Sequence, residues 1–122
     1  MRSPCSVKNC KTTYTQVIHT VIPVEDSLFT FPNSPIKCAG APQKIMYLAE
    51  EAWRRRGVSA HIHYRSALAV LFGVKKYADA LWDVVNQRKI NVHLRQNLVE
   101  VRPDTKEAVF VNLDTQEETV VP

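Results

Sequence analysis

One cysteine in the chain stands in a setting that favours sulfur chemistry. Cys38 lies in the segment 37–44 (KCAGAPQK), where Pro42 suits the first turn of a helix because that turn does not need its missing N–H group. A helix N-terminus carries free N–H groups and a positive dipole end, and with Lys37 and Lys44 it should favour the ionised thiolate. The segment therefore predicts that Cys38 is a sulfur nucleophile and that Lys44 supports it electrostatically. The alternative is a buried, inert core cysteine.

The elements around Cys38 follow from the spacing of apolar residues. Residues 28–31 (LFTF) form a β-favouring run that the loop 32–35 (PNSP) stops. Apolar residues then recur at helical spacing from residue 45 to 53, basic residues fill the last turn, and Gly57 is the usual left-handed helix terminator. Alternation at residues 60–64 predicts a second strand. Cys38 therefore falls in a strand-to-helix loop, the edge where α/β sheets bind ligands.

The second half of the chain continues this pattern. A helix with a core-facing apolar stripe and a strand near residues 92–94 come first, followed by an antiparallel hairpin of residues 98–102 and 108–111 and a further strand at 119–121. The order predicts an α/β layered domain with a parallel sheet, βαβαβ, and a C-terminal antiparallel β-meander. The helical stripe is Val74, Tyr77, Ala78, Leu81, Val84 and Val85.

Three strings of the sequence carry a family resemblance: residues 29–33 (FTFPN), 37–48 (KCAGAPQKIMYL) and 72–81 (FGVKKYADAL). Through them, residues 28–121 resemble the central part of mitochondrial-type sulfide:quinone oxidoreductases. The resemblance implies an incomplete Rossmann-like second nucleotide-binding domain over residues 28–122, a degenerate and partial version of the dinucleotide-binding fold. Residues 1–27 stay unassigned, as a disordered or a transit-like segment, because residues 1–24 have basic but no acidic side chains.

The resemblance also implies a chemistry. In that family two cysteines near the flavin take up the sulfur of hydrogen sulfide as a persulfide and pass two electrons to FAD, which hands them to ubiquinone. The sulfur then leaves to an acceptor such as glutathione or sulfite. Cys38 matches one of the two cysteines, and the other is expected beyond Pro122. The expected location is mitochondrial, with peripheral attachment of the full enzyme to the inner membrane.

The chain departs from a working dinucleotide site. Such a site needs Gly-x-Gly-x-x-Gly at the first strand-to-helix turn and an acidic residue at the end of the second strand. Here the turn reads KCAGAP and the second strand ends in residues 64–66 (YRS). We therefore expect no NAD binding, no FAD fingerprint in this chain, and no activity of the chain alone.

The composition bears on the class of protein and on whether it binds nucleic acid or spans a membrane. The 122 residues are 45% hydrophobic and 23% charged, as in an ordinary globular domain, and no apolar run approaches the roughly 18 residues of a membrane span. The net charge of +4 comes from scattered basic residues, so we predict no nucleic-acid partner. The clusters 54–56 and 75–76 are interpreted as solvated helix faces.

Two further groups of residues could suggest a metal site. His61, His63 and His93 suggest zinc, but a polar strand face is the preferred interpretation and no metal is predicted. Cys5 and Cys10 have no second pair with which to complete a metal or disulfide site.

Two other functions stay open at the level of sequence. The first is a non-catalytic α/β binding module derived from the same fold. The second is a thiol-based sulfur carrier that works through Cys38 without a flavin.

Overall fold

The computed structural model describes residues 26–122, and the predictions for Cys5, Cys10 and the transit-like segment lie outside the described residues. The chain alternates strands and helices before it ends in three strands. In order, the elements are β1 (Asp26–Phe31), α2 (Ala41–Arg55), β2 (His61–Ser66), α3 (Lys75–Gln87), β3 (Asn91–His93), β4 (Gln96–Arg102), β5 (Glu107–Asn112) and β6 (Glu118–Val121).

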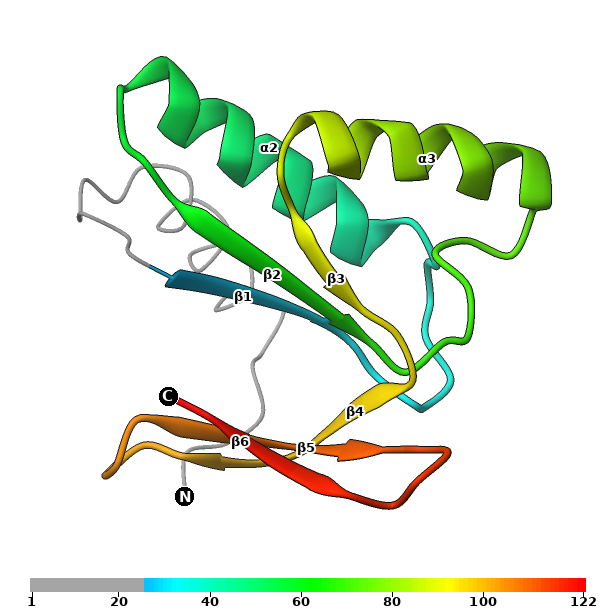
Figure 1. Ribbon diagram of the computed structural model, residues 1–122, viewed down its shortest axis with the longest axis vertical. Coiled ribbons are helices and arrows are strands. Elements are labelled where there is room, and N and C mark those ends of the chain that lie inside the picture. Colours follow the sequence, from blue (N-terminus) through cyan, green and yellow to red (C-terminus); the bar gives the residue numbers. More distant parts are fainter. Residues whose placement is uncertain (1–25) are drawn as a thin grey trace.

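The first half is the predicted βαβαβ unit. Strands β1, β2 and β3 form a parallel sheet in that order, with Phe29 opposite Tyr64 and Tyr64 opposite Val92. Both helices lie on one face of this sheet (Figure 1). Strand β1 begins at Asp26, two residues before the predicted strand. An α/β architecture with a parallel sheet is therefore confirmed.

Helix α2 begins and ends as its sequence predicts. Pro42 lies in its first turn and Gly40 precedes it at the N-cap. At the other end Gly57 has a φ of 72°, a left-handed value that glycine adopts without the steric cost of a Cβ atom. The amide of Val58 then donates to the carbonyl of Trp53, which closes the last turn.

The C-terminal meander is also confirmed. Strands β4, β5 and β6 pair antiparallel, with Arg102 opposite Glu107 across the predicted turn. The meander lies on the side of the parallel sheet opposite the helices (Figure 1). The guanidinium of Arg65, on β2, stacks 5.0 Å from the ring centroid of Phe110, on β5, and so connects the two sheets.

The main core lies between the helices and the parallel sheet. Its fully or nearly fully buried members come from the strands, the helices and the loops that join them. They are Phe31, Met46, Ala49, Trp53, Ile62, Tyr64, Leu71, Val85 and Ile90. Neither helix of the described chain has the length and apolarity needed to cross a lipid bilayer.

The predicted stripe of α3 is only partly correct. Ala78 and Val85 are buried, but Val74 is 49% exposed and Tyr77 58% exposed. The first turn of α3 extends past the carboxyl ends of the parallel strands, so its apolar side chains have no sheet beneath them (Figure 1). The prediction that Val74 and Tyr77 face the core was wrong for this reason.

Candidate functional site

The loop between β1 and α2 presents Cys38 to solvent. Cys38 is a free thiol with an exposed side chain, so the alternative of a buried, inert cysteine is wrong. Its backbone is nevertheless held, because its carbonyl accepts from the amide of Ala41 at 3.4 Å. Earlier in the loop, the amide of Asn33 donates to Oδ1 of Asn97 on β4 at 3.1 Å. The loop is thus tied at both ends while the sulfur stays accessible.

The start of α2 carries no negative group. Its first turn contains no acidic residue, and no side chain forms a capping hydrogen bond with Gly40 at the N-cap position. Helix starts are usually capped by an oxygen-bearing side chain, which satisfies free N–H groups and lowers the local positive potential. Cys38 precedes Ala41 by three residues, as the sequence predicts. Its role as a nucleophile stays a prediction.

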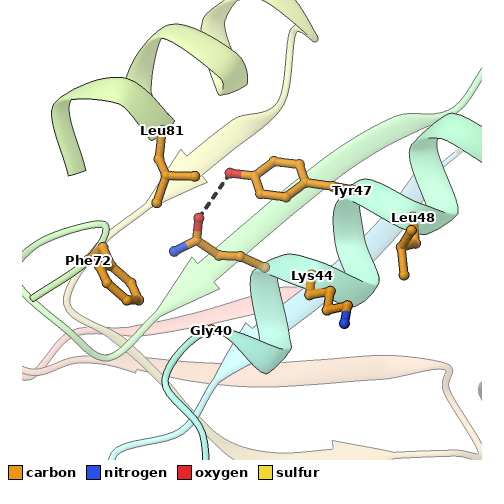
Figure 2. Close-up of a pocket in the computed structure, with 7 residues that line it drawn as sticks. Gly40, Lys44, Tyr47, Leu48, Phe72 and Leu81 are labelled. Carbon is orange, nitrogen blue, oxygen red and sulfur yellow. Dashed lines mark hydrogen bonds between the residues drawn. The ribbon is translucent and has the colours of Figure 1, made fainter. Parts of the chain in front are cut away.

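A buried glutamine fixes this end of the helix. Gln43 is 3% exposed, and its Nε2 donates to the carbonyl of Leu71 at 2.6 Å. The hydroxyl of Tyr47 donates to Oε1 of Gln43 at 2.9 Å (Figure 2). Burial raises the pKa of Tyr47 above its ordinary value, so the hydroxyl keeps its proton at neutral pH. These bonds join the first two turns of α2 to the loop after β2.

Gln43 has none of the functional roles that the sequence predicts for the segment 37–44. The signal that could have found it is its spacing: Gln43 precedes Met46 by three residues and so lies on the buried face of α2. A polar side chain at such a position requires hydrogen-bond partners, because an unpaired buried amide costs free energy.

Lys44 lines a shallow pocket of about 310 Å³ between α2, the loop after β2 and α3. Figure 2 shows its side chain pointing away from Tyr47. Cys38 is not among the lining residues, so Lys44 and Cys38 share one end of α2 without sharing this pocket. The pocket is lined by Gly40, Gln43, Lys44, Tyr47, Leu48, Phe72 and Leu81.

The described residues do not fit a dinucleotide cofactor. At the β1–α2 turn, Pro42 removes one of the N–H groups that would face a pyrophosphate, and the glycine pattern for close backbone approach is missing. Strand β2 ends at Ser66, which is 1% exposed and accepts a hydrogen bond from the amide of Leu68 at 3.2 Å. A buried serine cannot replace the carboxylate that normally holds the ribose. Residues 26–122 therefore supply neither the turn nor the acid for FAD or NAD.

The histidines lie on the face of the parallel sheet that points toward the meander. The rings of His63 and His93 stack with centroids 6.3 Å apart, and Nε2 of His63 lies 3.4 Å from Oδ1 of Asp26. Burial, followed by the charges of Arg65 and His63, lowers the pKa of His93. Within residues 26–122, no three His, Cys, Asp or Glu side chains are grouped closely enough to hold a metal ion.

Three sequence relatives share one name. The chain is 55% identical over 100 residues to "Sulfide:quinone oxidoreductase, mitochondrial" of Mus musculus, which covers 80% of this chain and 22% of the relative. For the proteins of that name from Dictyostelium discoideum and Schizosaccharomyces pombe, the identities are 37% and 42%. Those matches cover 86% and 73% of this chain and 24% and 20% of the relatives. No family model matches the chain.

Two solved structures share the fold. A chain in the Tetrahymena thermophila mitochondrial ATP synthase aligns with a TM-score of 0.78 and 20% identity, covering 98% of this chain and 30% of its own length. The sulfide:quinone oxidoreductase of Aquifex aeolicus aligns with a TM-score of 0.70 and 14% identity, covering 95% of this chain and 27% of its own. At these identities the likeness shows the fold alone.

The fold and the loop together define an incomplete Rossmann-like α/β domain with a thiol where a glycine-rich turn would be. The sequence matches then give the family: the chain is homologous to one part of the mitochondrial sulfide:quinone oxidoreductases and belongs with them. It spans about a fifth of the length of these relatives.

Proposed function

We propose that this chain supplies the sulfur-binding cysteine of a sulfide:quinone oxidoreductase, and that this cysteine is Cys38. The observation that carries the proposal is the exposed thiol of Cys38, three residues before a helix start that has no acidic residue. Sulfide must reach the sulfur directly, so exposure is a requirement. An anionic sulfur must also be tolerated there, and a positive helix end favours one.

The proposed step is a thiol–disulfide exchange. Hydrosulfide attacks Cys38 while it is joined to a second cysteine, which lies outside residues 26–122. The bond between the two cysteines breaks, a new S–S bond forms on Cys38 as a persulfide, and the second cysteine leaves as a thiolate with the electron pair. The outer sulfur of the persulfide is later transferred to an acceptor, such as glutathione or sulfite.

The chain's own residues hold and orient this sulfur. The free N–H groups of α2 face the loop, and Lys37 and Lys44 add positive charge near the same helix end. Gln43 keeps the first turns of α2 in place through its bonds to Leu71 and Tyr47. A fixed helix start presents a constant electrostatic environment to the reacting sulfur.

The rest of the reaction is proposed to need the remainder of a full-length protein. When bound there, FAD would supply an acceptor for two electrons that ubiquinone can reoxidise. No residue between 26 and 122 is assigned to FAD, because the β1–α2 turn does not fit a dinucleotide. We therefore propose that the chain alone is inactive, and that the complete enzyme is mitochondrial and attaches peripherally to the inner membrane.

A chimera tests the proposal in a complete enzyme. In this chimera, the matched segment of the mouse relative is replaced by the corresponding residues of this chain. Cys38→Ser is expected to abolish sulfide-dependent ubiquinone reduction, whereas Ser34→Ala, an exposed change in the same loop, should leave it intact. Sulfide-dependent reduction that persists in Cys38→Ser at the rate of the unmodified chimera would show that Cys38 does not receive the sulfide sulfur.

The same proteins separate the two other functions. A chimera that reduces ubiquinone with sulfide supports the oxidoreductase, whereas a non-catalytic binding module predicts a chimera without this activity. A flavin-independent sulfur carrier predicts a persulfide on Cys38 in the isolated chain. Mass spectrometry of the isolated chain after exposure to a persulfide donor distinguishes this case.

A further inference from the structure

Apolar side chains are exposed beside the pocket between α2 and α3 and at the start of α3. Leu48, Val74 and Tyr77 are 39%, 49% and 58% exposed. Leu48 lines the pocket between the two helices together with Phe72 and Leu81, and Figure 2 shows these three around the pocket. We call Leu48, Phe72, Val74, Tyr77 and Leu81 the helix-face patch.

Two observations link members of the helix-face patch. Leu48, Phe72 and Leu81 line the same pocket, and the ring of Phe72 contacts that of Tyr77 edge to face with centroids 6.5 Å apart. Val74 is joined to the start of α3, because its carbonyl accepts from the amide of Tyr77 at 3.0 Å. Large contiguous apolar patches are uncommon on soluble monomers and usually mark an interaction site.

We propose that the helix-face patch binds the remainder of a full-length sulfide:quinone oxidoreductase. The inference rests on the family relationship and not on the role of Cys38. The relatives are about four to five times longer than the matched segment, so most of their surface comes from sequence that this chain does not match. Sequence of that length can cover an exposed patch within one folded protein.

The patch also indicates the character of the surface that covers it. Aromatic and leucine side chains at its centre match the apolar centre of an interface, where charged residues are rare. Lys44 lines the same pocket and places a positive charge at the rim. The covering surface is therefore apolar, with a carboxylate opposite Lys44. Because Gly40 also lines the pocket, this surface comes to lie beside the loop that carries Cys38.

Hydroxyl-radical footprinting tests the interface without relying on activity. In the isolated chain Tyr77 and Leu48 should be oxidised readily, because both side chains are exposed. In the chimera both should be protected several-fold. Val120, which is 49% exposed on β6, reports whether such protection is confined to the patch. If the chimera fails to fold, the same measurement is made on the mouse protein at the positions aligned with Tyr77 and Leu48.

Two results would overturn the proposal. Equal oxidation of Tyr77 in the isolated chain and in the full-length protein would show that nothing covers the patch. Concentration-dependent dimerisation of the isolated chain, abolished by Tyr77→Glu but not by Val120→Glu, together with an unprotected Tyr77 in the chimera, would show that a second copy occupies it. Sedimentation velocity measures the dimer. Loss of sulfide oxidation in Cys38→Ser bears on neither result, so this test and that of the proposed function fail independently.

Discussion

The two ends of helix α2 are built from opposite kinds of residues. At the C-terminal end, Glu50 and Glu51 pair with Arg54 and Arg55 of the last turn and with Arg88, which follows α3. Basic side chains suit this end because the helix dipole is negative there. Acids and bases are close together, so the charges of this end are largely compensated and join α2 to the end of α3.

At the N-terminal end, no side chain compensates the dipole. Gly40 provides no side-chain cap, the first turn has no acid, and Lys44 adds further positive charge. The hydrogen bonds of Gln43 hold the backbone in place without adding a charge. The difference shows how one helix can be stabilised by ion pairs at one end and keep the other end favourable for an anion.

The largest effect is expected from the buried middle of α2, which supports both ends. Met46 is 0% exposed, so Met46→Ala should leave a cavity and lower the free energy of unfolding by about 2–5 kcal/mol. Leu48→Ala on the same helix is the matched control and should cost much less, because Leu48 is partly exposed. Urea unfolding of the isolated chain measures both. Equal losses would show that α2 does not pack as described.

The ion pairs at the C-terminal end of α2 are tested by removing Arg88, the arginine that links this end to α3. In the ion pair between Arg88 and Glu50, Glu50 is mostly buried and Arg88 is partly buried, so Arg88→Met should lower the free energy of unfolding by about 1–2 kcal/mol. Lys75→Met removes an exposed i,i+4 pair with Asp79 and should change the free energy of unfolding by less than about 0.5 kcal/mol. If Arg88→Met is as mild as Lys75→Met, the ion pairs do not stabilise this end.

Acid should act on the C-terminal end of α2. Hydrogen bonds from Arg54 and then Arg55 lower the pKa of Glu51 from 4.5 to about 2. Because the folded value is the lower one, the stabilisation is complete above pH 4.5 and is lost as pH falls toward 2. Glu51→Gln should therefore flatten the pH dependence of the urea midpoint in this range, and Asp104→Asn, on the exposed hairpin turn, should not. A pH dependence unchanged by Glu51→Gln would contradict the assignment.

The smallest expected effect concerns the N-terminal end of α2, where no side chain compensates the helix dipole. Lys44→Met should slow alkylation of Cys38 by iodoacetamide at neutral pH about two- to fivefold, because one nearby positive charge contributes roughly 0.3–1 kcal/mol to the stability of an anion. Arg55→Met removes a charge at the opposite end and should leave the rate unchanged. Equal rates for all three proteins would show that Lys44 does not support the thiolate.

Local sequence patterns were sufficient to predict where α2 begins and ends, the β4–β5 hairpin and the place of Cys38. The bounds of α2 follow from Pro42 and Gly57, because both residues restrict or permit backbone angles without any help from distant contacts. The hairpin of β4 and β5 follows from two β-favouring runs around a short turn. The place of Cys38 between β1 and α2 follows from these same signals.

Other features depend on residues that meet only in the folded chain. Arg88 reaches Glu50 across 38 positions, and Gln43 reaches the carbonyl of Leu71 across 28, so no helical or strand period reveals either contact. The exposure of Val74 and Tyr77 depends on where the sheet ends relative to α3, which the apolar period of a helix does not contain. The chemical role proposed for Cys38 depends further on groups outside residues 26–122.

The most direct test of the central claim is the fate of sulfide sulfur in the chimera. After a single turnover with sulfide, the protein is quenched with an alkylating reagent, digested with trypsin and analysed by mass spectrometry. The account predicts one additional sulfur on the peptide of residues 38–44, carried by Cys38. A chimera that reduces ubiquinone with sulfide while this peptide contains only alkylated Cys38, without an additional sulfur, would contradict it.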